Sequence, residues 1–393
     1  MTLPPALVDA VAAAGFVTPD YGGQCLDGVL PAVAAAVAAP LGAPAAQESF
    51  AAQSRLGIPD ARRVCVVLID GLGHEMLMER SGHAPFLRQA MGNGRVLTVG
   101  YPSTTAASMG LFGTGAAPGA TGLAGYTVRN PRTGALANLV SWEGADDAED
   151  WQREPTLFSL LEGAGVAVSS VGPPRFAGSG LTQAALRGGR YVPAERLEDR
   201  VDAAVFELSV PGVVYLYWGD VDKKGHQHGW RSREWADALT HADRELARLA
   251  RSLPAGTLLV VTADHGMVDV DRELLVDVAR VPTLKRGVEL VAGEPRATHV
   301  HVRPGEDEAV LARWRARLGD SAVVLSRDEA VGAGWFGPVS PHVIPMIGDL
   351  VVAARGRGGV VDSRTQTPHS LELRGMHGSL TPGEMLVPLV VVA

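Results

Sequence analysis

The sequence contains few cysteines, no long uninterrupted apolar run and no excess of basic residues. Cys25 and Cys65 are its two cysteines, and Cys65 stands inside an apolar run where a buried thiol is expected rather than half of a disulfide. Such sparse cysteine fits a reducing compartment. The N-terminus lacks a basic start followed by an unbroken apolar segment, and Pro31, Pro40 and Pro44 interrupt the Ala-rich stretch. We therefore expect a cytoplasmic protein with no membrane span and no secretory signal.

The charge balance argues against a broad basic surface. The chain carries 35 Lys and Arg against 43 Asp and Glu, which gives a formal net charge of -8, and aromatic residues make up only 5%. No basic and aromatic stripe is visible, so a nucleic-acid partner is not expected. A small anionic substrate would need a local positive centre, such as bound metal ions. The sequence does not indicate the oligomeric state.

Apolar runs and amphipathic segments alternate along the 393 residues, and this order predicts an α/β fold. A helical stripe precedes Leu253-Pro254, with apolar residues at alternating steps of four and three from Trp235 to Leu249. The expected strands are continuous apolar runs, which suit a parallel sheet covered on both faces. They are Val64 to Ile69, Val166 to Val171, Val213 to Tyr217, Leu258 to Val261 and Met385 to Val392.

The pattern of apolar and polar residues changes after residue 267. Two short apolar runs flank a helical pattern over residues 307–319, which predicts a small α/β insertion or cap at 268–349. The catalytic core would then consist of residues 1–267 and 350–393. Residues 1–50 are Ala-rich, and we expect them to pack only loosely on this core.

Three of the predicted strands run directly into acidic residues. Asp70 follows the first, Asp220 and Asp222 follow the third, and Asp264 with His265 follows the fourth. The carboxyl ends of parallel strands share one edge of a sheet, where ligands bind. Carboxylates gathered at one edge would repel each other strongly unless cations lie among them. Metal binding is the simplest explanation of this grouping.

Histidines stand near the same acids. His226 follows Asp222 by four residues, His265 adjoins Asp264, and His377 precedes the last predicted strand. Three Asp and three His could supply two three-ligand sites, each with open positions for substrate. Mixed Asp and His ligands favour zinc, with manganese or iron as alternatives.

Residues 100–108, Gly-Tyr-Pro-Ser-Thr-Thr-Ala-Ala-Ser, contain the candidate nucleophiles. Ser103, Thr104 and Thr105 precede small residues, so they indicate a helix N-terminus, where Ser and Thr are also preferred caps. Unpaired N–H groups and the positive end of the helix dipole can bind a phosphate there. A metal-coordinated hydroxyl at this place could attack phosphorus.

In order and spacing, these motifs resemble the nucleotide pyrophosphatase/phosphodiesterases of the alkaline phosphatase superfamily. The resemblance covers about residues 64–393. It rests on an Asp after the first strand, a Thr followed nine residues later by Thr-Gly, and the motifs DxxGH, DHGM and GxHG. They occur here as Asp70, Thr105 with Thr114-Gly115, Asp222 to His226, Asp264 to Met267 and Gly375 to Gly378.

The resemblance implies a doubly wound, mostly parallel alkaline phosphatase-like sheet flanked by helices, and it implies roles for the residues. One zinc would be held by Asp222, His226 and His377, and the other by Asp70, Asp264 and His265. Thr105 would be the nucleophile, because the nine-residue spacing selects it over Thr104. The asparagine that the family carries three residues after the nucleophile is replaced by Ser108, whose hydroxyl or backbone N–H would make the oxyanion contact.

The implied activity is metal-dependent hydrolysis of phosphodiester or pyrophosphate bonds, in nucleotides or related small phosphate esters, through a phosphothreonine intermediate. The sequence leaves two alternatives open. One is a phosphomonoesterase or phosphonate hydrolase on the same two-metal core, and the other is a non-catalytic metal-containing binding protein. No arginine adjoins Thr105 to clamp a monoester dianion, which favours the diester.

Overall fold

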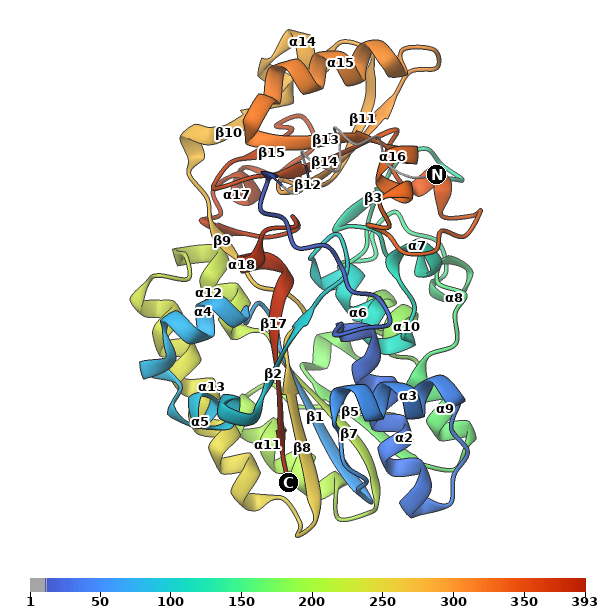
Figure 1. Cartoon of the computed structure of the whole chain (residues 1–393), viewed down its shortest axis with the longest axis vertical. Coiled ribbons are helices and arrows are strands. Elements are labelled where there is room, and N and C mark those ends of the chain that lie inside the picture. Colours follow the sequence, from blue (N-terminus) through green and yellow to red (C-terminus); the bar gives the residue numbers. More distant parts are fainter. Residues whose placement is uncertain (1–10, 12) are drawn as a thin grey trace.

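The computed structural model describes residue 11 and residues 13–393, and it places a large sheet and a small sheet at opposite ends of the molecule (Figure 1). The large sheet has seven strands in the order β2-β17-β8-β1-β7-β5-β6. Its strands are β2 (Arg95–Thr98), β17 (Leu386–Val392), β8 (Thr257–Thr262), β1 (Arg63–Ile69), β7 (Gly212–Trp218), β5 (Ala167–Gly172) and β6 (Arg190–Pro193).

The large sheet is mostly parallel, as the sequence predicts. β1 pairs in parallel with both β7 and β8, and β5 pairs in parallel with β7 and β6. β17 is the exception, because it runs antiparallel to β8 and β2. All five predicted strands are confirmed. All side chains of β8 are buried, on both faces of the sheet. This explains why the run Leu258 to Val261 is apolar without alternation.

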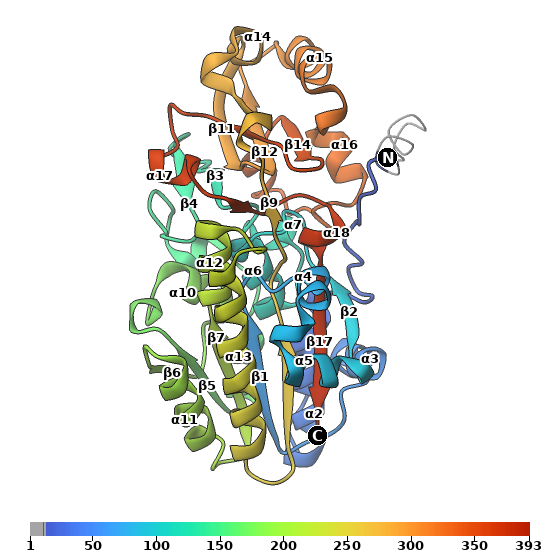
Figure 2. The same cartoon turned by 90° about the vertical axis from the view of Figure 1, so that its left-hand side faces the viewer.

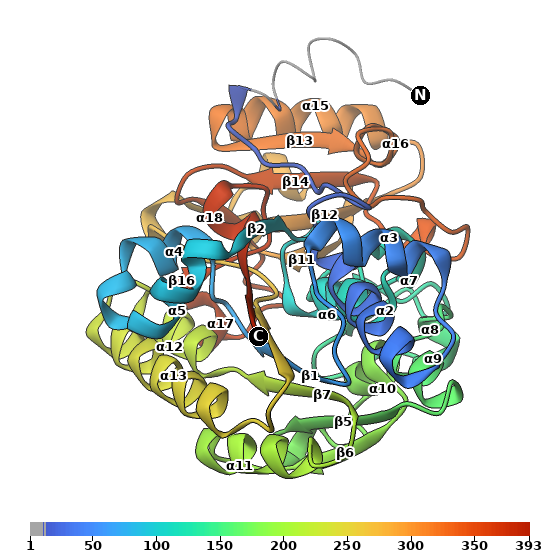
Figure 3. The same cartoon turned by 60° about the horizontal axis from the view of Figure 1, so that its bottom comes forward.

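Helices cover both faces of the large sheet, which gives the doubly wound architecture (Figures 2 and 3). One face carries α4 (His74–Glu79), α5 (Pro85–Ala90), α11 (Leu197–Glu207), α12 (Asp220–His228) and α13 (Arg233–Ser252). The other carries α2 (Val29–Leu41), α3 (Gln47–Leu56), α6 (Thr105–Thr114), α9 (Leu157–Gly163) and α10 (Gly180–Leu186). The predicted amphipathic helix is α13, and it ends before Leu253.

The prediction that residues 1–50 pack loosely is wrong for the part that the structure describes. α2 spans the Ala-rich stretch, and side chains such as Leu30, Val33 and Ala36 are fully buried. Alanine has the highest helix propensity, and its small side chain lets a helix approach the sheet closely. Pro40 lies in the last turn of α2, and the Ala36 carbonyl, to which it cannot donate, accepts from the Ala61 N–H at 3.0 Å instead. Residues 1–10 lie outside the described residues.

The small sheet is antiparallel, in the order β11-β12-β14-β13. Its strands are β11 (Val288–Glu294), β12 (Ala297–Val302), β14 (Leu350–Ala354) and β13 (Ala322–Ser326), and its helices are α14 (Pro282–Lys285), α15 (Asp307–Leu318) and α16 (Arg327–Gly332). The two predicted strands and the predicted helix of this region are confirmed. Val288, Val300, Val310 and Trp314 belong to a separate buried core between sheet and helices.

The boundary expected at residue 349 needs correction. β14 begins at Leu350 and lies between β12 and β13, so the small sheet extends beyond that boundary. β15 (Gly359–Val361) then pairs with β10 (Leu275–Asp277). The apolar run that forms β14 carries no signal of which sheet it joins, so the sequence pattern could not place it. We call residues 275–361 the small subdomain.

Short elements connect these two parts. They are α7 (Pro118–Thr121), α8 (Ala148–Trp151), α17 (Pro368–Leu371), α18 (Pro382–Met385) and the strand pairs β3 (Thr127–Arg129) with β4 (Leu136–Asn138) and β9 (Val268–Asp269) with β16 (Gly375–Met376). Among the described residues, no helix has the length and apolar character needed to cross a bilayer.

Candidate two-metal site

Three adjacent strands bring the predicted acids to one edge of the large sheet. β8, β1 and β7 are neighbours, and Asp264, Asp70 and Asp222 follow their carboxyl ends. The approach of these segments is close, because Gly71 has a φ of +71° and a Cβ there would lie 2.8 Å from Asp222 Cβ. Only glycine fits such a position without strain.

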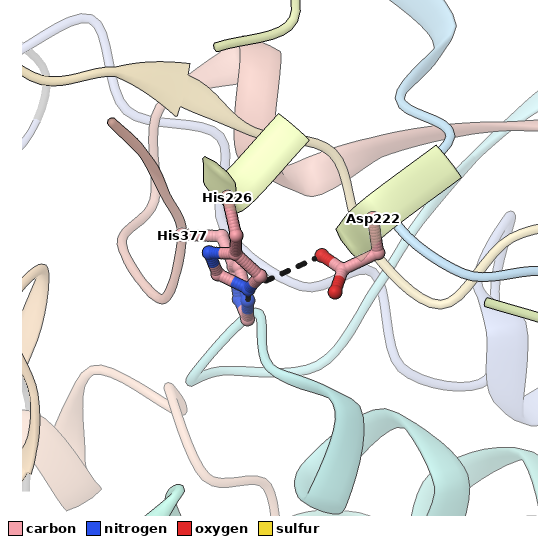
Figure 4. A group of neighbouring side chains, drawn as sticks. All are labelled: Asp222, His226 and His377. Carbon is pink, nitrogen blue, oxygen red and sulfur yellow. Dashed lines mark hydrogen bonds and ion pairs between the residues drawn. The ribbon is translucent and has the colours of Figure 1, made fainter. Parts of the chain in front are cut away.

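The first group of potential ligands comprises Asp222, His226 and His377 (Figure 4). Asp222 and His226 lie one turn apart on α12, so both side chains share one helix face. Asp222 Oδ1 lies 3.3 Å from His226 Nε2, and His226 Nε2 lies 3.3 Å from His377 Nε2. His377 follows β16, which brings a segment far along the chain beside α12.

The second group comprises Asp70, Asp264 and His265, and all three are buried. His265 Nε2 lies 3.4 Å from Asp70 Oδ1 and 3.6 Å from Asp264 Oδ2. The second oxygen of each carboxylate is held by a donor: the Tyr217 hydroxyl donates to Asp70 Oδ2, and the Gly71 N–H donates to Asp264 Oδ1 at 3.1 Å. The rings of His265 and His377 stack, with centroids 3.6 Å apart, so the two groups are adjacent.

Backbone carbonyls hold all three imidazoles in one tautomer. The Nδ1 atom of His226 lies 2.7 Å from Gly375 O, that of His377 lies 2.9 Å from Ser103 O, and that of His265 lies 3.0 Å from Gly266 O. A carbonyl only accepts hydrogen bonds, so each Nδ1 carries a proton and Nε2 is the ring nitrogen left to bind a metal. This arrangement is the usual orientation of a metal-binding histidine.

The residues present fit divalent cations. Ligand atoms about 2.0–2.1 Å from a tetrahedral ion are about 3.3 Å from one another, and the spacings here agree closely. Asp70 Oδ1, Asp222 Oδ1 and Asp264 Oδ2 are buried and have no hydrogen-bond partner among the described residues. The lone pairs of His226 Nε2 and His377 Nε2 face each other. A cation between these atoms satisfies all of them at once.

The pKa shifts lead to the same conclusion. Burial raises the pKa of the Asp70 carboxyl well above its ordinary value, and repulsion from Asp264 and Asp222 raises it further. Burial also raises the pKa of Asp264. Burial lowers the pKa of His377 well below 6.5, so its imidazole is neutral and able to bind a metal at neutral pH. Cations among these groups would favour the ionised carboxylates.

Thr105 lies beside the second group. It is the first residue of α6, and its Oγ1 lies 3.2 Å from His265 Nε2, at the same spacing as the other ligand atoms. Thr104 is the N-cap residue but makes no side-chain capping hydrogen bond. The hydroxyl of Ser103 donates to Ser379 O at 2.6 Å, so it has a structural partner. Of the three hydroxyls, the geometry favours Thr105 as nucleophile.

Ser108 lies one turn further along α6. Its N–H donates to Thr104 O, which removes the backbone N–H as an oxyanion donor, and its hydroxyl is buried without a hydrogen-bond partner among the described residues. The oxyanion contact through the Ser108 hydroxyl therefore stays a prediction.

A cavity of about 1000 Å³ opens beside the first group. Asp222, His226 and His377 line one wall, and the small subdomain supplies part of the wall through residues such as Glu294. Burial raises the pKa of the Glu294 carboxyl to about 8, so this side chain is neutral at pH 7 and does not repel an anion.

A third group of potential ligands, which the sequence analysis missed, lies on α11 and α13. It consists of Glu198, His241 and Glu245. His241 Nε2 lies 3.0 Å from Glu198 Oε1, while Glu245 accepts from Arg244 at 3.2 Å and from Arg248 at 2.7 Å. Because arginines already compensate these carboxylates, the group is an ion-pair network and needs no metal.

Tyr217 is the clearest residue of the site that the sequence pattern did not reveal. It lies inside the strand β7, so its ring is expected in the core, yet its hydroxyl donates to the potential ligand Asp70. We expect Tyr217→Phe to lower zinc affinity by roughly tenfold or more, because losing such a partner frees the carboxylate to rotate. Competition with a chromophoric chelator measures this affinity.

Tyr215→Phe is the matched control, since Tyr215 lies on the same strand and, among the described residues, its hydroxyl donates to Met109 Sδ, at 3.8 Å, and to no potential metal ligand. Equal zinc affinity in the two variants would contradict the role of the Tyr217 hydroxyl.

The sheet, the paired Asp and His ligand sets and the adjacent hydroxyl together form a candidate phosphoryl-transfer site. Residues 64–380 match the family model described as "Type I phosphodiesterase / nucleotide pyrophosphatase", and the chain belongs to this family.

Sequence relatives among characterised proteins match only in part. A phosphopentomutase of Caldanaerobacter subterraneus is 27% identical over 175 residues, which are 42% of this chain and 43% of that protein. Human ectonucleotide pyrophosphatase/phosphodiesterase family member 7 is 35% identical over 65 residues, 15% of this chain and 14% of that protein. The matched region thus spans less than half of the length of each relative.

Solved structures with this fold cover more of the chain. Murine ectonucleotide pyrophosphatase/phosphodiesterase 5 superposes with a TM-score of 0.68 at 19% identity, covering 83% of this chain and 87% of that one. Phosphonoacetate hydrolase of Sinorhizobium meliloti superposes with a TM-score of 0.65 at 22% identity, covering 85% and 90%. These similarities confirm the predicted fold class.

Proposed function

We propose that this protein hydrolyses phosphodiester or pyrophosphate bonds, in nucleotides or related small phosphate esters, through a phosphothreonine intermediate on Thr105. The observation that carries the proposal is the position of Thr105 Oγ1, 3.2 Å from His265 Nε2, at the edge of a double ligand set. A binding protein that only stores metal would need no hydroxyl at this place, which argues against the non-catalytic alternative.

The proposed reaction has two displacement steps. Thr105 Oγ1 attacks phosphorus and forms a new P–O bond while the bond to the leaving alcohol or phosphate breaks, and the hydroxyl proton is released to solvent, from which the leaving oxygen is protonated. Water then attacks the phosphothreonine, the P–Oγ1 bond breaks, and the threonine hydroxyl is restored. The first N–H groups of α6 have no intrahelical partner, and Thr104 does not cap them with its side chain, so they can bind a phosphate oxygen.

The ligand sets suit two zinc ions, one held by Asp222, His226 and His377 and the other by Asp70, Asp264 and His265. When bound, such ions lower the pKa of coordinated hydroxyls and neutralise charge that develops on the oxygens of the phosphoryl group. Manganese or iron could occupy the same ligands.

The cationic side chains that line the cavity bear on the choice between a diester and a monoester dianion. Arg175 and Arg196 pair with Glu195 and Glu198, whereas Lys223 lines the cavity beside Asp222 and could contact a monoester. Arg200 lines the cavity, but its guanidinium donates to the backbone carbonyls of Ala194, Glu195 and Tyr217 and is therefore committed to the fold. A monoester carries one more negative charge than a diester and would need a further cationic clamp. The cavity also offers room for a substituent much larger than phosphate.

Hydrolysis of bis-p-nitrophenyl phosphate, compared with p-nitrophenyl phosphate, tests the proposal. The protein is first treated with a chelator and zinc is then restored. Zinc-dependent preference for the diester is the expected result. Preference for the monoester would move the assignment to a phosphomonoesterase, and activity on a phosphonate alone would move it to a phosphonate hydrolase. No turnover with both metal sites loaded would favour the non-catalytic alternative.

A further inference from the structure

A buried ion pair joins the small subdomain to the large sheet. Arg296 lies between β11 and β12, and Glu384 lies on α18, next to β17. Both side chains are fully buried, and the guanidinium donates in two parallel hydrogen bonds, Nε to Oε1 at 2.9 Å and Nη2 to Oε2 at 2.7 Å. Arg296 Nη1 also donates to Gly358 O in the small subdomain at 2.6 Å. This geometry orients both partners strictly.

Glu384 contacts the loops of both ligand groups. Its Oε1 accepts from the Ser379 N–H at 3.0 Å, two residues after His377. Its backbone carbonyl accepts from the Gly266 N–H at 2.9 Å, next to His265. The approach is tight, because a Cβ on Gly266 would lie 2.0 Å from Gly383 O. The segment around Glu384 therefore fixes the spacing between the first and the second group.

The same network reaches the nucleophile. Ser379 O accepts from the Ser103 hydroxyl at 2.6 Å, and Ser103 O lies 2.9 Å from His377 Nδ1, from which it accepts. The Ser379 hydroxyl donates to Ala354 O of β14, again in the small subdomain, at 2.6 Å. Two contacts from the small subdomain thus hold one loop, and that loop holds both His377 and the segment that leads to Thr105.

We propose that Arg296 is a positioning residue through which the small subdomain sets the relative geometry of the two metal groups and Thr105. This inference rests on the proposed function for its catalytic consequence, but its effect on metal binding can be measured without turnover. A guanidinium at this place is not a substrate ligand, because Arg296 is fully enclosed and Glu384 and Gly358 occupy its donors.

The test compares Arg296→Met with the double variant Arg296→Met/Glu384→Met. Removing one partner of a buried ion pair leaves an uncompensated charge and destabilises a fold, whereas replacing both by apolar residues is often neutral. Thermal unfolding of the metal-free protein, zinc affinity by chelator competition, and kcat and KM for a diester are the readouts. Arg315→Met is the control, because Arg315 pairs with Glu329 inside the small subdomain.

We expect Arg296→Met to lower stability, and both zinc affinity and kcat roughly tenfold or more, with a smaller change in KM. The double variant should recover part of the stability, since the Ser379 N–H, the Thr381 hydroxyl and the Gly358 carbonyl also lose a partner. It should recover neither zinc affinity nor kcat, while the control should alter stability alone. A double variant that recovers zinc affinity and kcat together with stability would overturn the proposal, since the ion pair would then be merely structural.

Arg296→Lys keeps the inference testable if the methionine variants fail to fold. Lysine retains the charge but cannot make the two parallel hydrogen bonds, so we expect zinc affinity below that of the wild type. Wild-type zinc affinity and kcat in this variant would overturn the proposal. If the wild type binds two zinc ions but does not turn over diesters, the proposed function fails, while the zinc affinities still decide the role of Arg296.

Discussion

Thr105→Ala is expected to lower kcat for a phosphodiester by roughly a thousandfold or more, because the variant has no hydroxyl to form the covalent intermediate. KM should change much less, since the metal ligands and the first turn of α6 remain. Steady-state kinetics with zinc-saturated protein measure both constants. Rapid acid quenching with a radiolabelled substrate should trap phosphoprotein in the wild type and none in the variant.

Thr104→Ala provides the matched control for this experiment. Thr104 precedes the nucleophile candidate, its side chain makes no capping hydrogen bond, and it is buried at the cavity wall. Its removal should cost far less activity than that of Thr105. Undiminished activity in Thr105→Ala, or a larger loss in Thr104→Ala, would rule out the covalent mechanism at Thr105.

Asp264→Asn is expected to have opposite effects on activity and on the stability of the metal-free protein. The variant should bind one zinc ion instead of two and lose roughly a thousandfold in kcat, because the second group loses one of its anionic ligands. Without metal, however, the substitution removes a charge whose repulsion raises the pKa of Asp70. A relief of about 1 kcal/mol would raise Tm by roughly 1 °C in a chain of this length.

Metal analysis after dialysis and thermal unfolding with a chelator measure these two effects. Asp220→Asn is the control, because Asp220 also lines the cavity but belongs to neither ligand group. That variant should keep two zinc ions and near-normal activity. A metal-free Asp264→Asn protein less stable than the wild type would show that repulsion does not dominate this cluster.

The strands and the predicted acids could be read from the sequence because both leave local signals. A buried parallel strand is a continuous apolar run, and the residue that follows it lies at the ligand-binding edge, so Asp70 and Asp264 were placed without tertiary information. The structure brings all six predicted ligands into two groups. The choice of Thr105 over Thr104 required the family spacing, since both hydroxyls fit a helix N-terminus equally well.

The remaining features depend on contacts between distant parts of the chain. β14 reads as a strand, but an apolar run does not tell which sheet it enters. α2 reads as loosely packed, because alanine gives little hydrophobic signal even when a helix is fully enclosed. The pair of Arg296 and Glu384 joins residues 88 positions apart, and no local pattern reveals such a partner. Local periodicity therefore predicted the elements better than their assembly.

The position of β17 determines when the large sheet can be completed during synthesis on the ribosome. β2 is made early, yet it joins the large sheet only through β17, which pairs with β2 on one side and β8 on the other. His377 and Glu384 are translated just before β17. During synthesis, the first ligand group stays incomplete until His377 has been translated, and the sheet stays open at this edge until β17 follows. The two ligand groups and the large sheet are therefore completed together, by the last segment of the core to be made.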